Sequence, residues 1–289
     1  MFPELIDTRP LRRAVDDGLN WVVRNWGGEL EAAAYPLLML LGWIERLLIA
    51  TPWWLFIAFF VGLAFLATRN WKLPAVVFLG LVFLGLMQLW RDAMVTTALM
   101  IAATLTAIVI SIPVGVWMSR SARVRNVVTP VLDLMQTMPS FVYLIPTVMI
   151  FGPGKIPALL ATIVYASPPL VRLTDLGLRN VDPAVMEASR AFGTTASQRL
   201  FGVQIPLALP TILAGINQTT MMALAMVVIA SMIGAGGLGY QVLQGIGRLE
   251  VSRGLFAGLG IVVLAIVFDR ITQAYGRRIQ ERIGVGEAR

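Results

Sequence analysis

Few residues in this 289-residue chain could carry out chemistry, and two reactive types are missing altogether. The sequence has no cysteine and no histidine, so it can form no disulfide, no thiolate or imidazole metal site, and no Ser-His-Asp triad. It also lacks the G-x-x-x-x-G-K-[ST] loop that cradles nucleotide phosphates. We therefore expect no catalytic residue, no metal site and no bound cofactor, and any ATP must be bound by another chain.

One glycine motif could suggest a dinucleotide site. Gly234, Gly236 and Gly239 in "GAGGLG" satisfy the pattern G-x-G-x-x-G. A dinucleotide site needs this motif between a short strand and a helix of a βαβ unit. Here the motif follows a long apolar run, so we interpret it as a glycine turn or a re-entrant segment that contributes to an outer gate.

Two groups of residues within apolar runs are candidates for a translocation path. The first lies in "MQTMPSFVY", within a run that contains three prolines, and broken helices in transporters expose backbone to a cavity. The second is a polar cluster at 217–220, whose amides must face protein or water. Interhelical hydrogen bonding explains this second cluster equally well. The candidate residues are Gln136, Met138, Pro139, Tyr143, Asn217, Gln218 and Met221.

Three acids lie close to the apolar runs, namely Asp92, Asp133 and Asp269. A carboxylate inside the membrane would suggest proton or sodium coupling. Asp92 and Asp269 adjoin arginines near expected helix ends, and Asp133 is about one and a half turns inside its run. We therefore favour structural pairing for all three.

The elements that must position these residues are membrane helices. With 57% hydrophobic and 13% charged residues and a mean hydropathy of +0.78, the chain has too little polar surface for a soluble globule. Its apolar runs are continuous rather than alternating, which favours helices over a barrel. We predict an all-α, polytopic integral membrane protein with about seven transmembrane helices. The runs are 53–68, 74–90, 93–118, 127–151, 156–172, 207–233 and 254–275.

The distribution of basic residues predicts the orientation of the chain. Most of them fall in alternate connections and in the C-terminal segment, which the positive-inside rule places in the cytoplasm. These residues are Arg69, Lys72, Arg120, Arg123, Arg125, Arg172, Arg179, Arg190, Arg199, Arg270, Arg277, Arg278, Arg282 and Arg289. The N-terminus is then outside, and the tail at 281–289 is cytoplasmic. This topology explains the net charge of +7, so we expect no nucleic-acid partner.

Residues 1–52 are predicted to form extracytoplasmic scaffold helices. Residues 11–26 gather their apolar side chains on one helical stripe, so this helix either lies on the outer membrane surface or packs against another domain of the assembly. The apolar stretch 36–54 contains Glu45 and Arg46 near its middle, which indicates a second interfacial helix rather than a span. The first 20 residues lack the apolar region of a cleaved signal peptide.

A charged segment, 172–206, separates the fifth and sixth apolar runs. At about 2.5 kcal/mol for each of its seven charges, burial at the bilayer centre would cost on the order of 18 kcal/mol, so the segment must lie outside the lipid. Asp182 and Pro183 predict a helix start, and Gly193 predicts its end. Thr195 and Gln198 form a capping box for a second short helix that ends before Pro206.

The first of these short helices has an apolar face beside its charges. Such a face suits docking on a partner, although an ordinary amphipathic loop on the lipid surface would show the same pattern. The residues that share this face are Ala184, Val185, Ala188, Ala191 and Phe192.

The same segment resembles a known family. Residues 187–193 and 203–206 fit E-A-A-x-x-x-G followed after nine residues by I-x-L-P, the coupling signature of ABC importer permeases. Ser189 stands where the third residue of this pattern is usually alanine. The stretches 131–152, 215–239 and 264–278 are similar to permeases for glycine betaine, proline betaine and choline, so the resemblance covers about residues 90–280. The coupling residues that it implies are Glu187, Ala188, Ser189, Phe192, Gly193 and Pro206.

The resemblance implies a membrane subunit of the bacterial inner membrane with no chemistry of its own. Residues 91–280 would form a type I ABC importer permease core of five helices, and 53–90 two peripheral transmembrane helices. The implied partners are a second copy of the chain, cytoplasmic ATPase subunits, an extracytoplasmic substrate-binding protein and membrane lipid. The implied solutes are glycine betaine, proline betaine and choline.

Other functions stay open from the sequence. Within the same family, the solute could instead be methionine, another amino acid or a sulfonate. A secondary transporter that works alone would show functional intramembrane charges and internal repeats, and neither is evident. An integral membrane enzyme is disfavoured because no convergent acid pair accompanies the missing histidine and cysteine.

Overall fold

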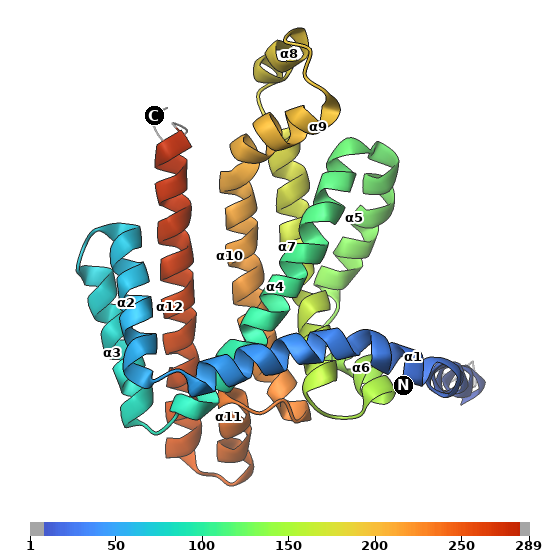
Figure 1. The fold of residues 1–289 in the computed structure, drawn as a ribbon. Helices are drawn as coiled ribbons and strands as arrows, with labels where there is room; N and C mark the ends of the chain where they lie inside the picture. Colours follow the sequence, from blue (N-terminus) through green and yellow to red (C-terminus); the bar gives the residue numbers. More distant parts are fainter. Residues whose placement is uncertain (1–8, 284–289) are drawn as a thin grey trace, which may run out of the picture.

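Long helices that run between the two ends of the molecule form its core. In this computed structural model, which describes residues 9–283, no strand occurs within that range (Figure 1). The long core helices are α4 (Trp90–Arg120), α7 (Lys155–Arg179), α10 (Ile205–Ala230) and α12 (Val251–Ile283). Each is apolar and long enough to cross a membrane, which confirms the predicted all-α membrane fold.

The fifth core segment is broken rather than straight. The three prolines of the run 127–151 predict a broken helix, and the structure confirms a break: α5 (Ala122–Thr137) and the pair η1 (Ser140–Tyr143) and α6 (Leu144–Phe151) meet at an angle of 98°. Pro139 explains the break, because the residue before a proline avoids the helical region. Met138 accordingly has extended backbone, with φ −68° and ψ 134°.

A hairpin of two shorter helices lies beside α12. The helices α2 (Trp53–Thr68) and α3 (Lys72–Leu86) match the first two predicted runs, with 16 and 15 residues respectively. The Phe60 ring packs edge-on against Phe268 of α12 at 5.4 Å between centroids. The hairpin therefore adds a peripheral layer to the five-segment core (Figure 1).

The N-terminal region is one helix rather than the two that the sequence predicts. The helix α1 (Arg9–Ala50) is continuous through Pro36, whose exposed position lets water satisfy the carbonyl that loses its partner. Although α1 has the length and hydropathy of a span, only 11% of its most apolar window is buried, and it lies transverse to the core helices (Figure 1). Glu45 accepts hydrogen bonds from Lys155 Nζ at 2.6 and 2.8 Å, which fixes α1 to the start of α7.

Small residues let α4, α7 and α10 approach closely. A Cβ added at Gly215 of α10 would lie 2.9 Å from Leu170 Cδ1 and 3.2 Å from the Leu170 Cα atom in α7. The Thr219 hydroxyl donates to the Ala166 carbonyl at 2.9 Å across the same interface. Close backbone packing of this kind makes α7 and α10 a rigid pair.

At one end, the chain between α7 and α10 extends beyond the bundle; we call residues 180–199 the projecting segment (Figure 1). It contains α8 (Pro183–Ala191) and α9 (Ala196–Arg199). The charged segment was predicted to leave the bundle at residue 172, but α7 continues to Arg179. This is possible because its charges are paired: Arg172 with Asp133 of α5, and Arg179 with Asp175.

The second short helix was predicted to end before Pro206, and α9 does end at Arg199. The chain nevertheless stays helical beyond it, because a π-helical turn, η2 (Leu200–Gln204), leads directly into α10. Pro206 lies in the first turn of α10, where a missing N–H is tolerated. The projecting segment therefore connects directly to the helix that follows it.

The opposite end contains a glycine turn and a short helix that the sequence analysis missed. After η3 (Ser231–Ile233), Gly234, Gly236 and Gly237 have φ values of 96°, 79° and 78°, followed by α11 (Leu238–Gly247). The "GAGGLG" motif is thus a turn between helices, with no strand before it in the described chain. The C-terminal tail was predicted from residue 281, but α12 continues to Ile283, and 284–289 lie outside the described residues.

Candidate functional site

The helix α8 begins where the sequence predicts it. Asp182 Oδ1 accepts a hydrogen bond from the Ala184 backbone N–H at 2.8 Å, and Pro183 occupies the first helical turn. The aspartate also places a negative charge at the positive end of the helix dipole. These local interactions allow a helix of nine residues to form away from the bundle.

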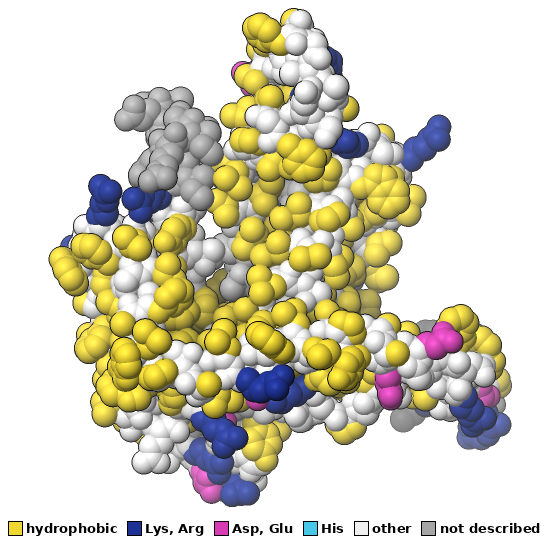
Figure 2. Space-filling view, in the orientation of Figure 1, with side chains coloured by type: hydrophobic (Ala, Val, Ile, Leu, Met, Phe, Trp, Pro, Cys, Tyr) yellow, Lys and Arg dark blue, Asp and Glu magenta, His cyan; other side chains and the backbone are white. Residues whose placement is uncertain are grey.

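The apolar face of α8 has no partner within the described chain. Phe192 is 87% exposed, and Figure 2 shows hydrophobic side chains over the projecting segment. A phenylalanine with this exposure loses the free energy that burial would provide, so its face is suited to a partner surface. The residues of the predicted face are all exposed, namely Ala184, Val185, Ala188, Ala191 and Phe192.

The turn after α8 has a backbone conformation that favours glycine. Gly193 has φ +71°, and a Cβ there would meet nothing within 4 Å, so backbone strain rather than lack of space disfavours most other residues. Ser189 is buried behind this turn, and its carbonyl accepts from the Thr194 hydroxyl at 2.7 Å. Its small side chain is therefore required by local packing, whereas Glu187 is exposed with no ion pair among the described residues.

The projecting segment is anchored at both ends and braced from a third helix. Val181 and Leu200, which flank α8 and α9, are 7% and 6% exposed. Arg120 at the end of α4 donates to the Ala196 carbonyl at 3.2 Å. Sequence reasoning assigned Arg120 only to a basic loop, because nothing in the sequence shows that residues 76 positions apart meet.

The predicted capping box at α9 is present. The Gln198 backbone N–H donates to Thr195 Oγ1 at 3.3 Å, and the Thr195 N–H donates to Gln198 Oε1 at 2.9 Å. The reciprocal bonds satisfy two amides that would otherwise lack partners. Together with the anchors, they fix the projecting segment relative to α7 and α10.

The first group of translocation candidates lies around the break between α5 and α6. Met138 and Tyr143 line a cavity of about 320 Å³ together with residues of α6 and α7, whereas Gln136 and Pro139 are exposed outside it. The Tyr143 hydroxyl donates to the Met135 carbonyl and so ties η1 back to α5. Its ring packs edge-on against Tyr165 at 6.1 Å. Tyr143 therefore stabilises the break.

The second group lies between α10 and α12. Asn217 Nδ2 donates to Asp269 Oδ1 at 3.1 Å, and the same oxygen accepts from Gln273 Nε2 at 2.7 Å. Asn217 also lines a cavity of about 230 Å³ with Thr272 and Gln273. Gln218 is exposed and Met221 is partly buried on the same helix. The structure thus keeps the two groups in separate cavities, and their role in a translocation path stays a prediction.

The three membrane-proximal acids all have polar partners. Asp269 pairs as described above, and Asp133 pairs with Arg172. Asp92 Oδ2 accepts from Gln241 Nε2 at 2.7 Å, while Gln241 Oε1 accepts from Arg253 at 2.8 Å. Structural pairing, as predicted, accounts for these carboxylates and gives no reason to invoke ion coupling.

Comparisons with known proteins agree with this arrangement. The chain is 45% identical over 278 residues to the glycine betaine/proline betaine transport system permease protein ProW of Escherichia coli (strain K12), covering 94% of this chain and 77% of that protein. It is 42% identical to the glycine betaine transport system permease protein OpuAB of Bacillus subtilis (strain 168), covering 91% and 93% of the two chains. Both matches extend well beyond residues 90–280 and into the N-terminal region.

Solved structures show the same fold at lower identity. A chain of the MetNI methionine ABC transporter, in an inward facing conformation, superposes with a TM-score of 0.61 at 23% identity, covering 66% of this chain and 95% of that chain. Residues 107–281 match the family described as the binding-protein-dependent transport system inner membrane component. Membership implies a binding protein and an ATPase as partners, a multi-pass location in the inner membrane, and a transport subunit rather than an enzyme. This chain therefore belongs to the family of inner membrane components of binding-protein-dependent transport systems.

Proposed function

We propose that this chain is the permease subunit of an ATP-driven importer for quaternary ammonium compatible solutes, such as glycine betaine, proline betaine and choline. The choice of solute is supported by relatives whose names specify glycine betaine at 42–46% identity. The resemblance to a methionine transporter, at 23% identity, supports the fold alone.

The observation that carries the coupling part of this proposal is the exposed apolar face of α8. In the proposed complex this face lies in a groove of a cytoplasmic ATPase, with Glu187, Phe192 and Gly193 at the interface. Displacement of α8 is passed to α7 and α10, because Val181 and Leu200 bury the two ends of the projecting segment. The close packing of α7 and α10 then makes them move as one body.

The proposed assembly contains two copies of the chain, so that two α8 helices engage an ATPase dimer. The N-terminus and α1 lie outside and the C-terminus lies in the cytoplasm. This orientation is supported by basic residues in elements at the end that carries α8, namely Arg123 at the start of α5, Arg190 in α8 and Arg278 near the end of α12 (Figure 1). An extracytoplasmic binding protein delivers solute at the opposite end, and lipid surrounds α2 and α3.

Reconstitution tests both parts of the proposal. The chain is placed in proteoliposomes with its ATPase and its binding protein, and ATP hydrolysis is measured with glycine betaine, proline betaine, choline, methionine and a sulfonate. We expect stimulation by at least one quaternary ammonium compound and none by methionine or the sulfonate. Stimulation by methionine or the sulfonate alone would assign the permease to another solute class. Solute uptake without the ATPase would contradict the coupling mechanism itself.

A further inference from the structure

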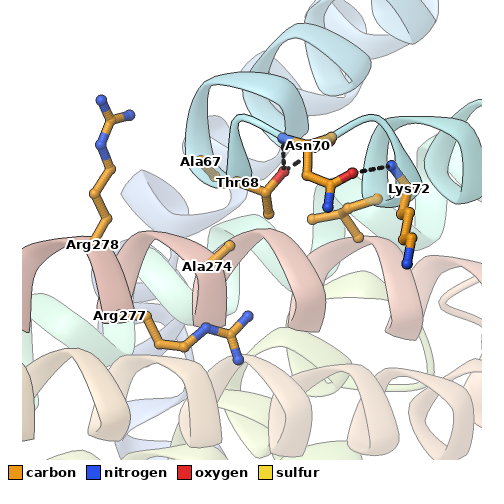
Figure 3. A pocket seen from close by; sticks show the side chains of 8 residues that line it. Ala67, Thr68, Asn70, Lys72, Ala274, Arg277 and Arg278 are labelled. Carbon is orange, nitrogen blue, oxygen red and sulfur yellow. Dashed lines mark hydrogen bonds between the residues drawn. The ribbon is translucent and has the colours of Figure 1, made fainter. Parts of the chain in front are cut away.

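A cationic pocket lies outside the regions discussed so far. It has a volume of about 340 Å³ and lies between the α2–α3 connection and the C-terminal part of α12 (Figure 3). Its polar lining consists of Thr68, Asn70, Lys72, Arg277 and Arg278. No carboxylate of the described residues lines it. Three positive charges therefore surround one cavity without a compensating acid.

Two of these charges are not neutralised elsewhere. Neither Lys72 nor Arg277 forms an ion pair with any residue that the structure describes. The Arg278 guanidinium donates to the Leu66 carbonyl, a neutral acceptor, and forms no ion pair with the described residues either. In Figure 3, Lys72 extends toward α12, the helix from which Arg277 projects. Like charges that line one cavity repel one another, and an anion bound in the cavity would relieve this repulsion.

Hydrogen bonds fix the polar wall between these charges. Asn70 Oδ1 accepts from the Lys72 backbone N–H at 3.2 Å, and the Asn70 N–H donates to Thr68 Oγ1 at 3.4 Å (Figure 3). With Oδ1 engaged, the Asn70 amide presents its Nδ2 as a donor. An ammonium, a guanidinium and an amide suit an anion that has several oxygen atoms, as phosphate does.

The position of the pocket indicates where such an anion would come from. Below it, α2 and α3 expose apolar side chains that suit lipid, including Phe59 (58% exposed) and Leu79 (66% exposed). Trp71, which precedes Lys72, is 71% exposed, and tryptophan is enriched at membrane–water interfaces. Figure 2 shows basic side chains directly above the apolar surface of the hairpin. The pocket thus lies at the depth of lipid headgroups.

We propose that this pocket binds a phosphate-bearing anion, the headgroup of an anionic phospholipid in the leaflet on the α8 side. Lys72 and Arg277 contact the phosphate oxygens, and the acyl chains lie along α2 and α3. The bound lipid joins the peripheral hairpin to α12. This site is separate from the solute path and does not depend on which solute is transported.

Native mass spectrometry of the purified full-length chain tests the proposal. The protein is titrated with phosphatidylglycerol, and with phosphatidylcholine of the same acyl chains as a zwitterionic control. The test variant is Lys72→Gln with Arg277→Gln, and the matched control is Arg123→Gln with Arg248→Gln, which removes equal charge from other exposed positions. At about fivefold for each charge removed, we expect about 25-fold weaker phosphatidylglycerol retention in the test variant and little change in the control.

Two further measurements identify the source of the anion and test whether the variants are folded. Competition by inorganic phosphate at millimolar concentration would support the phosphate chemistry but assign the site to the free ion. Failure to compete, with loss of lipid in the test variant, supports the headgroup. Equal loss in the test and control variants, or no preference for phosphatidylglycerol over phosphatidylcholine, would overturn the proposal. Lys72→Arg with Arg277→Lys, which keeps both charges, should retain the lipid and shows that any loss is not due to misfolding.

Discussion

The projecting segment and the α7–α10 interface differ in how far their side chains are buried, although adjacent stretches of the chain form them. In the projecting segment an aromatic side chain, Phe192, is 87% exposed, whereas in the interface Leu170 and Thr219 are fully buried. The apolar face of α8 has no partner within the described chain, whereas at Gly215 in the interface an added Cβ would lie 3.2 Å from the Leu170 Cα atom, closer than an ordinary contact. The surface that binds the proposed partner and the interface that resists deformation therefore lie in consecutive elements of the chain.

The largest effect is expected from Phe192→Ala. Loss of a large apolar contact at the centre of the proposed interface should weaken ATPase binding by at least about 2 kcal/mol, or roughly 30-fold. Because Phe192 contacts little in the chain itself, the thermal stability of the isolated permease should not change. Binding is measured by pull-down titration with the ATPase. The control is Phe59→Ala, which removes another exposed phenylalanine (58% exposed) from α2, outside the proposed interface. Equal weakening by both variants would contradict the placement of α8 in the interface.

Gly215→Val tests the close packing of the α7–α10 interface. A Cβ at this position already lies 3.2 Å from the Leu170 Cα atom, so the added methyl groups must push α7 and α10 apart. We expect a loss of about 1–3 kcal/mol in the free energy of unfolding. The measurement is thermal unfolding in detergent. Gly258→Val, where an added Cβ has no neighbour within 4 Å, should unfold near the wild-type temperature, and similar losses in both would mean that packing is not the cause.

Gly193→Val tests whether the orientation of α8 affects the coupling between the ATPase and the α7–α10 pair. Valine strongly disfavours φ +71°, so the turn should open at a cost of about 1–2 kcal/mol and misorient α8. In proteoliposomes, ATP hydrolysis should continue while uptake per ATP falls. Gly193→Asn is the control, since asparagine tolerates this region of φ and should keep transport. Unchanged uptake in the valine variant would contradict the proposal that α8 couples ATP hydrolysis to transport.

The smallest effect is expected from Asp182→Ala. Removal of the cap should destabilise α8 by about 1 kcal/mol, which increases amide hydrogen exchange in residues 183–191 without affecting α7. Asp182→Asn keeps an acceptor and should restore most of the protection. If exchange in α8 were the same in the alanine variant and the wild type, the helix would be held by contacts other than its cap.

Local features of this fold could be predicted from the sequence, whereas long-range ones could not. The Asp182 cap, the Thr195 capping box and the Gly193 turn depend on neighbours within a few residues, and all three are present. The contact between Asn217 and Asp269 joins residues 52 positions apart, and no pattern in the sequence indicates it. That pair joins Asn217 to α12, whereas Thr219 of the same polar cluster bonds to α7.

The expected division of the N-terminal region into two helices was wrong at Pro36, whereas the predicted break in the run 127–151 was confirmed at Pro139. Pro36 does not end α1, because its position is exposed to solvent, whereas Pro139 bends the chain by 98°. The same residue type thus has different effects in different surroundings. The helix α11 was missed although its ten residues are amphipathic, because the segment was interpreted only as a glycine turn or a re-entrant segment.

The length of α1 has a consequence for the membrane around the protein. A helix of 42 residues is about 63 Å long, roughly twice the thickness of the hydrocarbon layer. Because α1 is transverse to the core helices, most of this length lies in the plane of the bilayer if those helices cross it (Figure 1). Each copy then covers a larger footprint than its helical bundle alone. In a crowded membrane, α1 therefore sets a minimum spacing between neighbouring transporters.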